Sequence, residues 1–167
     1  MVLGRLQHIE GFTLAEALLA AAVLAMTVTA IVFPFTAAAM NQATEARTTM
    51  ATLLAEDLLE EILAKPFRDP QGQAQLGPDS GESSRLLFDN IDDYDGYLEA
   101  EGNIVSSDSS TVDDPAAVGL SRSVSTTYVY VSGQDGSEPP NFIRVDVIVR
   151  YREQPLVSVT RLVHWFE

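Results

Sequence analysis

An almost wholly apolar run from Phe12 to Met40 constrains the fold of this chain more than any other feature. As a helix, the part from Phe12 to Phe33 would extend about 33 Å at about 1.5 Å per residue, which matches a hydrocarbon core of about 30 Å. The run therefore predicts a helix that can cross a bilayer. Pro34 removes one backbone donor, so we expect the helix to bend or loosen there.

Glu16 lies inside this run, and its charge needs an explanation. A carboxylate within a bilayer costs about 2.5–3.5 kcal/mol on insertion scales, so a partner is expected. No Lys, Arg or His lies between Phe12 and Met40. Cleavage between Gly11 and Phe12 would create an α-amino group four residues before Glu16, on the same helix face. The amine could belong to the same chain or to a neighbour displaced by about one turn. In the second case Glu16 would fix the stagger between packed helices.

Two other interpretations of the N-terminus use the apolar run differently. In the first it is a plain membrane anchor, with the end that carries Arg5 in the cytoplasm and the C-terminal body outside. In the second it is a cleavable secretory signal with an A-x-A site at residues 37–39. The second is disfavoured because the apolar stretch exceeds the usual length of about 7–15 residues. A discarded segment would also gain nothing from Glu16.

Residues 41–65 are rich in helix formers and predict a second, amphipathic helical segment. Its apolar residues recur at four-residue spacing, and most charged residues lie elsewhere on the helical wheel. The apolar positions are Met50, Leu54, Leu58 and Ile62. Because Pro66 ends the pattern, the amphipathic helix is assigned to residues 41–67.

The C-terminal part, residues 118–167, predicts an antiparallel sheet. Apolar residues alternate with polar ones along 141–152, as in a strand with one buried face. Further strands are expected at 121–132 and 156–166, with a turn at Glu153–Pro155. The apolar stripe of the 41–67 helix can cover this sheet. The predicted fold class is therefore α+β: a long N-terminal helix packs its amphipathic half on a C-terminal antiparallel sheet. Residues 41–167 would form one soluble domain.

Residues 68–117 form an acidic region, predicted as loops with a short strand at 85–88. Twelve acidic residues lie from Asp69 to Asp114 against a single basic one, and the whole chain carries a net charge of −14. Nucleic-acid binding is excluded because it requires a basic patch. A solvated acidic turn is favoured around the densest carboxylates, although oxygen ligands at this density could also hold Ca²⁺. These weak calcium candidates are Asp92, Asp93 and Asp95.

Enzymatic chemistry finds little support in the composition. The chain contains no cysteine, and its two histidines are His8 and His164. No phosphate-binding loop, nucleophile elbow or zinc-ligand spacing is present. We therefore expect no catalytic residue, no cofactor-binding residue and no enzyme.

The stretch Gly11-Phe12-Thr13-Leu14-Ala15-Glu16 resembles the prepilin processing motif of the type IV pilin and type II secretion pseudopilin family. The resemblance implies a leader at residues 1–11, cleavage after Gly11 by the prepilin peptidase, and N-methylation of Phe12 by the same peptidase/methyltransferase. It implies that residues 12–40 leave the membrane for a filament core, and that Glu16 pairs with the N-terminus of an adjacent subunit. The run at 53–67 is similar, more loosely, to minor members of the family.

These features predict a structural minor pilin or pseudopilin, assembled into a type IV pilus or a type II secretion pseudopilus. Its partners would be the prepilin peptidase, other pilin-like subunits and the membrane. Before assembly it would cross the cytoplasmic (inner) membrane once, with the N-terminus inside and the C-terminal domain periplasmic. The alternative is a monomeric, membrane-anchored extracytoplasmic binding module with a calcium-dependent ligand site.

Overall fold

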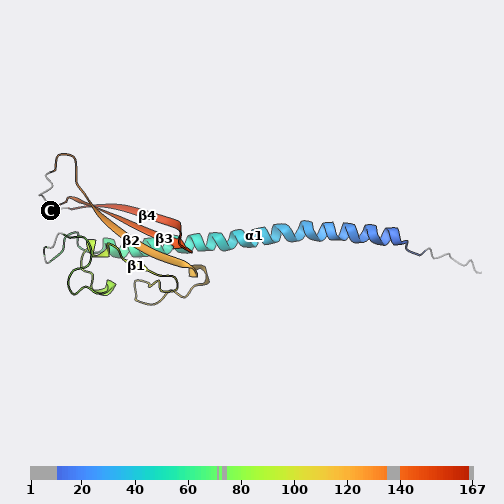
Figure 1. The fold of residues 1–167 in the computed structure, drawn as a ribbon, viewed down its shortest axis with the longest axis horizontal. Coiled ribbons are helices and arrows are strands. Elements are labelled where there is room, and N and C mark those ends of the chain that lie inside the picture. Colours follow the sequence, from blue (N-terminus) through green and yellow to red (C-terminus); the bar gives the residue numbers. More distant parts are fainter. Residues whose placement is uncertain (1–10, 71, 73–74, 135–139, 166–167) are drawn as a thin grey trace, which may run out of the picture. The chain divides into compact units, whose positions relative to one another are not determined.

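The computed structural model describes residues 11–70, 72, 75–134 and 140–165. One long helix precedes a four-stranded antiparallel sheet whose strands follow one another in chain order (Figure 1). The prediction of an α+β fold with an N-terminal helix and a C-terminal antiparallel sheet is therefore confirmed. The elements are α1 (Leu14–Leu63), β1 (Leu98–Glu99), β2 (Leu120–Val129), β3 (Phe142–Tyr151) and β4 (Gln154–His164).

The chain divides into two compact units between Ala43 and Thr44. In the first unit, the described side chains of α1 are all exposed, and this part of the helix is long and apolar enough to cross a membrane. Its threonine hydroxyls donate to backbone carbonyl oxygens four residues earlier in the same helix. Because these hydroxyls are satisfied internally, they need no water in a lipid environment. The helix is continuous through Pro34.

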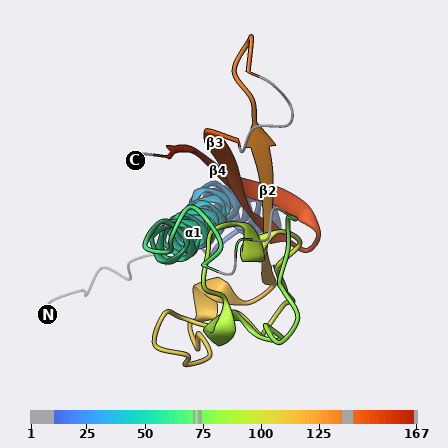
Figure 2. The ribbon, with the colours of Figure 1, turned by 90° about the vertical axis from the view of Figure 1, so that its left-hand side faces the viewer.

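In the second unit, α1 packs its apolar stripe against the sheet (Figure 2). Leu54, Leu58 and Ile62 are buried as predicted, and Met50 is half-buried. The sheet contributes a row of fully buried β3 residues to the same core, namely Ile143, Val145, Val147 and Val149. Burial of each such aliphatic side chain contributes about 1.5–3 kcal/mol to the stability of the fold. The contact between α1 and the sheet therefore forms the hydrophobic core of the second unit.

The two faces of the sheet differ in polarity. Along β3 the buried row alternates with the exposed Arg144 and the half-buried Asp146. On the neighbouring strands, the residues opposite these positions include the exposed Thr127 and Thr160. One face is therefore covered by α1 and the other is turned to water, as antiparallel sheets permit.

Two local predictions are wrong, and one short strand was missed. The expected strand at 85–88 is a turn of 3₁₀ helix at Arg85–Leu87, and its first side chain is drawn into ion pairs with carboxylates of other elements. The expected turn at Glu153–Pro155 lies one residue earlier, where Arg152 and Glu153 have φ values of +47° and +70°. Pro155 instead belongs to β4, an edge strand, where a missing N–H is tolerated. The short strand β1 was not predicted.

Candidate functional site

The predicted processing site lies just before α1. Gly11 and Phe12 are exposed and belong to a non-helical stretch that ends where the helix begins at Leu14. Phe12 is 76% exposed. Both sides of the expected scissile bond are therefore accessible residues outside regular structure, which is a geometry that a protease can bind.

Glu16 has a partner that the sequence analysis missed. The Thr13 backbone N–H and side-chain hydroxyl both donate to Glu16 Oε2, at 3.0 and 2.8 Å, and the Glu16 N–H donates to Thr13 Oγ1 at 3.2 Å. This reciprocal pattern is a capping box, in which the first and fourth residues of a T-x-x-E sequence satisfy free donors at a helix start. The sequence could have indicated it, because Thr13 stands three residues before Glu16. Among the described residues, Glu16 Oε1 accepts no hydrogen bond from a side chain or backbone group.

The three weak calcium candidates do not converge on one point. Asp92 Oδ2 accepts a hydrogen bond of 2.8 Å from the Tyr128 hydroxyl. Asp95 Oδ1 accepts one of 2.8 Å from the Thr126 N–H on β2. Asp93 Oδ2 accepts from two backbone N–H groups of its own turn. Each carboxylate thus serves a different structural contact.

The favoured description of this segment as a solvated acidic turn is wrong for two of its carboxylates. Asp92 and Asp93 are 2% and 1% exposed. They belong to a 3₁₀ turn whose neighbouring Ile91 and Tyr94 are core residues, and these apolar anchors carry the adjacent acids inward. The prediction was based on the number of charged residues in the segment and did not take into account the apolar Ile91 and Tyr94 that stand among them.

A different trio of carboxylates could hold a cation. Oxygen atoms of Glu82, Asp89 and Asp93 lie within 4.8 Å of one another. Burial raises the pKa of the Glu82 carboxyl, and the nearby negative charges of Asp93 and Asp89 raise it further, although the Asp79 N–H donates to it. Such crowding would be relieved by a cation with a preference for oxygen, such as Ca²⁺, which usually takes six to eight ligands. Only Asp93 is shared with the sequence-based candidates.

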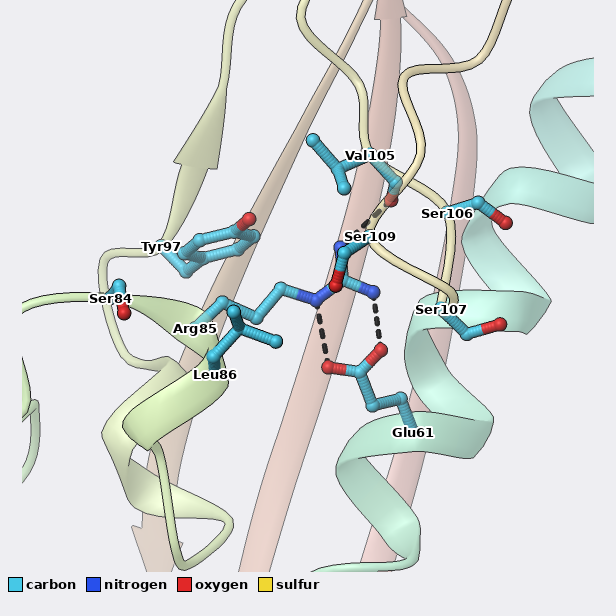
Figure 3. A pocket seen from close by; sticks show the side chains of 9 residues that line it. All are labelled: Glu61, Ser84, Arg85, Leu86, Tyr97, Val105, Ser106, Ser107 and Ser109. Carbon is cyan, nitrogen blue, oxygen red and sulfur yellow. Dashed lines mark hydrogen bonds and ion pairs between the residues drawn. The ribbon is translucent and has the colours of Figure 1, made fainter.

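A network of charged side chains connects α1 with the loops (Figure 3). Arg85 Nε donates to Glu61 Oε1 at 2.7 Å, and Arg85 Nη2 forms an ion pair with the other oxygen of the same carboxylate. Arg85 Nη1 also donates to Glu99 Oε1 at 3.1 Å. Burial alone would raise the pKa of Glu61, but hydrogen bonds from Arg85 and Tyr94 lower it below its ordinary value. The sequence did not predict this network because its members are far apart along the chain.

A hollow of about 420 Å³ lies beside this network. Figure 3 shows the Glu61 carboxylate and the Arg85 guanidinium facing each other in its wall. The remaining wall is formed by Tyr97, Leu86 and a group of small residues, Ser84, Val105, Ser106, Ser107 and Ser109. In this wall the positive charge of Arg85 and the negative charge of Glu61 are paired with each other.

No protein-family model matches this chain, and no curated protein or solved structure is significantly similar to it. The long apolar helix and the antiparallel sheet are compatible with a pilin-like shape. Functional inference therefore depends on the residues themselves, above all on the short stretch from Gly11 to Glu16.

Proposed function

We propose that this protein is a structural minor subunit of a pilin-like filament, either a type IV pilus or a type II secretion pseudopilus. One observation supports the proposal most strongly. The helix α1 combines an exposed apolar half, which carries a carboxylate near its start, with a second half covered by a folded sheet domain. The exposed apolar half needs an apolar environment. A membrane before assembly and a bundle of like helices after assembly would supply it.

The proposed pathway begins with the precursor in the cytoplasmic membrane, its N-terminus inside and its sheet domain outside. The prepilin peptidase removes residues 1–11, and the new N-terminus at Phe12 is methylated. The amine of one subunit then pairs with Glu16 of its neighbour. Lipid and protein are similarly apolar, so bundle formation needs specific contacts beyond hydrophobic burial. The ion pair and close packing at small residues would supply them.

Mass spectrometry of the N-terminus tests the processing step. The protein is purified from membranes of its native host, and its N-terminal peptide is identified. We expect a chain that begins with N-methylated Phe12. An intact Met1, or a chain that begins near Met40, would remove the basis of the proposal.

Two substitutions separate the two roles open to Glu16. Glu16→Gln keeps a side chain that can complete a capping box but removes the charge, whereas Glu16→Ala removes both. If the carboxylate pairs with an amine, both variants should insert into the membrane and both should be lost from sheared filaments. If the side chain only caps the helix, Glu16→Gln should be incorporated as well as the natural protein, and the ion-pair role would be rejected.

A second candidate function is an anchored extracytoplasmic module that binds calcium. The observation in its favour is the Glu82, Asp89 and Asp93 trio. Thermal unfolding of residues 44–167 with and without millimolar CaCl₂ tests it, with Glu82→Gln as the control variant. A rise in unfolding temperature that Glu82→Gln abolishes would support this function, and an unchanged temperature would exclude it.

A further inference from the structure

One side of the edge strand β4 has no neighbouring strand in the sheet. A backbone contact just beyond β3 and β4 shows which residues face that side. The Trp165 N–H donates to the Asn141 carbonyl oxygen at 2.9 Å, and in an antiparallel pair this bonding recurs at every second residue. Odd-numbered residues of β4 therefore bond to β3, and three even-numbered ones direct their backbone groups away from it. We call these three residues, Ser158, Thr160 and Leu162, the open edge.

The opposite side of the sheet is covered by the chain itself. There the Val124 N–H of β2 donates to the Tyr97 carbonyl oxygen at 2.9 Å, and the Thr126 N–H donates to Asp95 Oδ1 at 2.8 Å. Among the residues that the structure describes, none bonds in this way to the outward backbone groups of the open edge. The chain thus pairs one edge of its sheet with its own loops and leaves the other available to another chain.

The open edge also borders an incompletely covered part of the core. Edge strands are usually protected by a proline, a bulge or a charge that points inward. Pro155 and the register irregularity at Val149 both precede the open edge, and Arg161 is the one charged residue within 157–163. A further strand would pair the free backbone groups and cover the exposed parts of the flanking valines. These half-buried valines are Val157, Val159 and Val163.

Arg161 determines which strand can fit. The β3 residue opposite it is the buried Val145, so Arg161 lies on the face that α1 covers, yet its own side chain is exposed. It belongs to none of the ion pairs that the described residues form. A cation in the neighbouring position of an added strand would repel it, whereas a carboxylate would attract it.

The same argument disfavours a second copy of β4 as the added strand. In a parallel, in-register pair, the two Arg161 side chains would be neighbours. The strands run beside the packed half of α1 (Figure 1), so an antiparallel pair would point the two α1 helices in opposite directions. Two helices that enter the same membrane from one side cannot do this. The occupant must therefore come from a different sequence.

We propose that the open edge of β4 binds an extended segment of another protein, which becomes the fifth strand of the sheet. Its backbone pairs with the outward groups of Ser158, Thr160 and Leu162. It places an acidic side chain beside Arg161 and apolar side chains beside the half-buried valines. The proposal goes beyond the filament function and does not depend on cleavage after Gly11, so either can fail without the other.

Site-specific photo-cross-linking in the native host identifies the segment. A diazirine-bearing side chain is placed in the full-length protein at Leu162 in one strain and at Thr127 in another, because Thr127 is exposed on the inner strand β2. Position 162 should cross-link to one segment of another protein, identified by mass spectrometry, and position 127 should not. A product at neither position, or a product that contains β4 of a second copy, would overturn the proposal.

A proline substitution tests whether capture requires the open edge. Ser158→Pro removes an N–H that does not bond to β3, so the purified full-length variant should unfold within about 5 °C of the natural protein. It should reduce the cross-link at position 162 about tenfold or more, because the added strand loses a backbone partner. Ser158→Ala keeps this N–H and should change the yield less than about twofold. Equal yields in the two variants would reject strand pairing.

N-methylation of the captured segment provides an independent measurement. The segment is synthesised with one backbone nitrogen methylated at a time, and its binding to the purified full-length protein is measured. Methylation at every second residue should weaken binding about tenfold or more, while the residues between should tolerate it, because only alternate N–H groups face β4. A profile without this period of two would show that the segment binds by side chains alone and would overturn the proposal.

Discussion

The Arg122 guanidinium donates from Nη1 to the backbone carbonyl oxygen of Leu54 at 2.7 Å, which ties the inner strand β2, near its start, to the middle of the packed half of α1. The side chain is fully buried. Its Nε donates to Glu99 Oε2 at 2.5 Å, and its Nη2 donates to the Val105 carbonyl oxygen at 2.7 Å. One cation therefore joins the helix, the sheet and the loop that follows β1.

Removal of this cation should destabilise the folded domain strongly. Arg122→Met, measured in residues 44–167 by urea unfolding, should lower the free energy of unfolding by about 3–5 kcal/mol, because Glu99 loses a buried counterion. Arg144→Met is the matched control, since Arg144 is exposed and pairs with Asp146 at 2.8 Å. The control should lose less than about 1 kcal/mol. Equal losses in the two variants would show that burial does not determine how much each arginine contributes to the free energy of unfolding.

Gly119 should be hard to replace. It has φ +80°, and a Cβ atom added there would lie 2.8 Å from Tyr151 Cε2. Gly119→Ala should therefore lower the unfolding temperature through both backbone strain and a steric clash, with a loss of about 2–3 kcal/mol. Gly133 has φ +90° and no atom within 4 Å of such a Cβ. Gly133→Ala should lose about 1 kcal/mol from strain alone. A loss at Gly119 no larger than this would contradict the clash.

Repetitive patterns made the main elements predictable. The period-two alternation around Val145 and Val147 predicted β3, and the four-residue spacing that includes Leu54 and Leu58 predicted the buried stripe of α1. Both patterns arise because one face of the helix or strand is buried, so that apolar residues recur at a regular spacing along the chain. This spacing can be recognised without knowing which element covers the face.

The polar interior could not be predicted in this way. Arg122 and Glu99 are separated by 23 positions, and nothing local indicates that they meet. The burial of Asp92 depends on apolar neighbours and on Tyr128 from a distant strand. Such contacts depend on tertiary packing, which the sequence does not reveal. The density of charged residues therefore predicted a solvated turn, whereas Asp92 is buried in the structure. The Thr13–Glu16 contact is local and could have been read from the T-x-x-E spacing.

The domain should become more stable on mild acidification because of Asp92. Burial, together with the charges of Asp93 and Asp69, raises the pKa of Asp92 to about 6, although the Tyr128 hydroxyl donates to it. The ordinary value is 3.8, so between about pH 4 and pH 6 the folded state binds a proton that the unfolded state releases. The free energy of unfolding should rise by about 1–2 kcal/mol as pH falls from 7 to 5. Urea unfolding of residues 44–167 in the presence of EDTA measures this rise.

Asp92→Asn is the control for this pH dependence. Asparagine keeps an oxygen that can accept from Tyr128 but carries no charge at any pH. The variant should be more stable than the natural domain at pH 7, and its stability should change less between pH 7 and pH 5. A pH profile that is unchanged by the substitution would assign the effect to other carboxylates.

The capping box should hold the first turn of α1 in detergent micelles. Thr13→Val removes the hydroxyl that both donates to Glu16 Oε2 and accepts from the Glu16 N–H. The loss of an N-cap costs about 1 kcal/mol, so the Glu16 amide should exchange its hydrogen about fivefold faster. Thr13→Ser keeps the hydroxyl and should exchange at nearly the natural rate. The Ala51 amide, in the packed half of α1, should be unaffected in both variants. Unchanged exchange at Glu16 in Thr13→Val would show that the first turn is held by other contacts, and Glu16 would then be free for its neighbour.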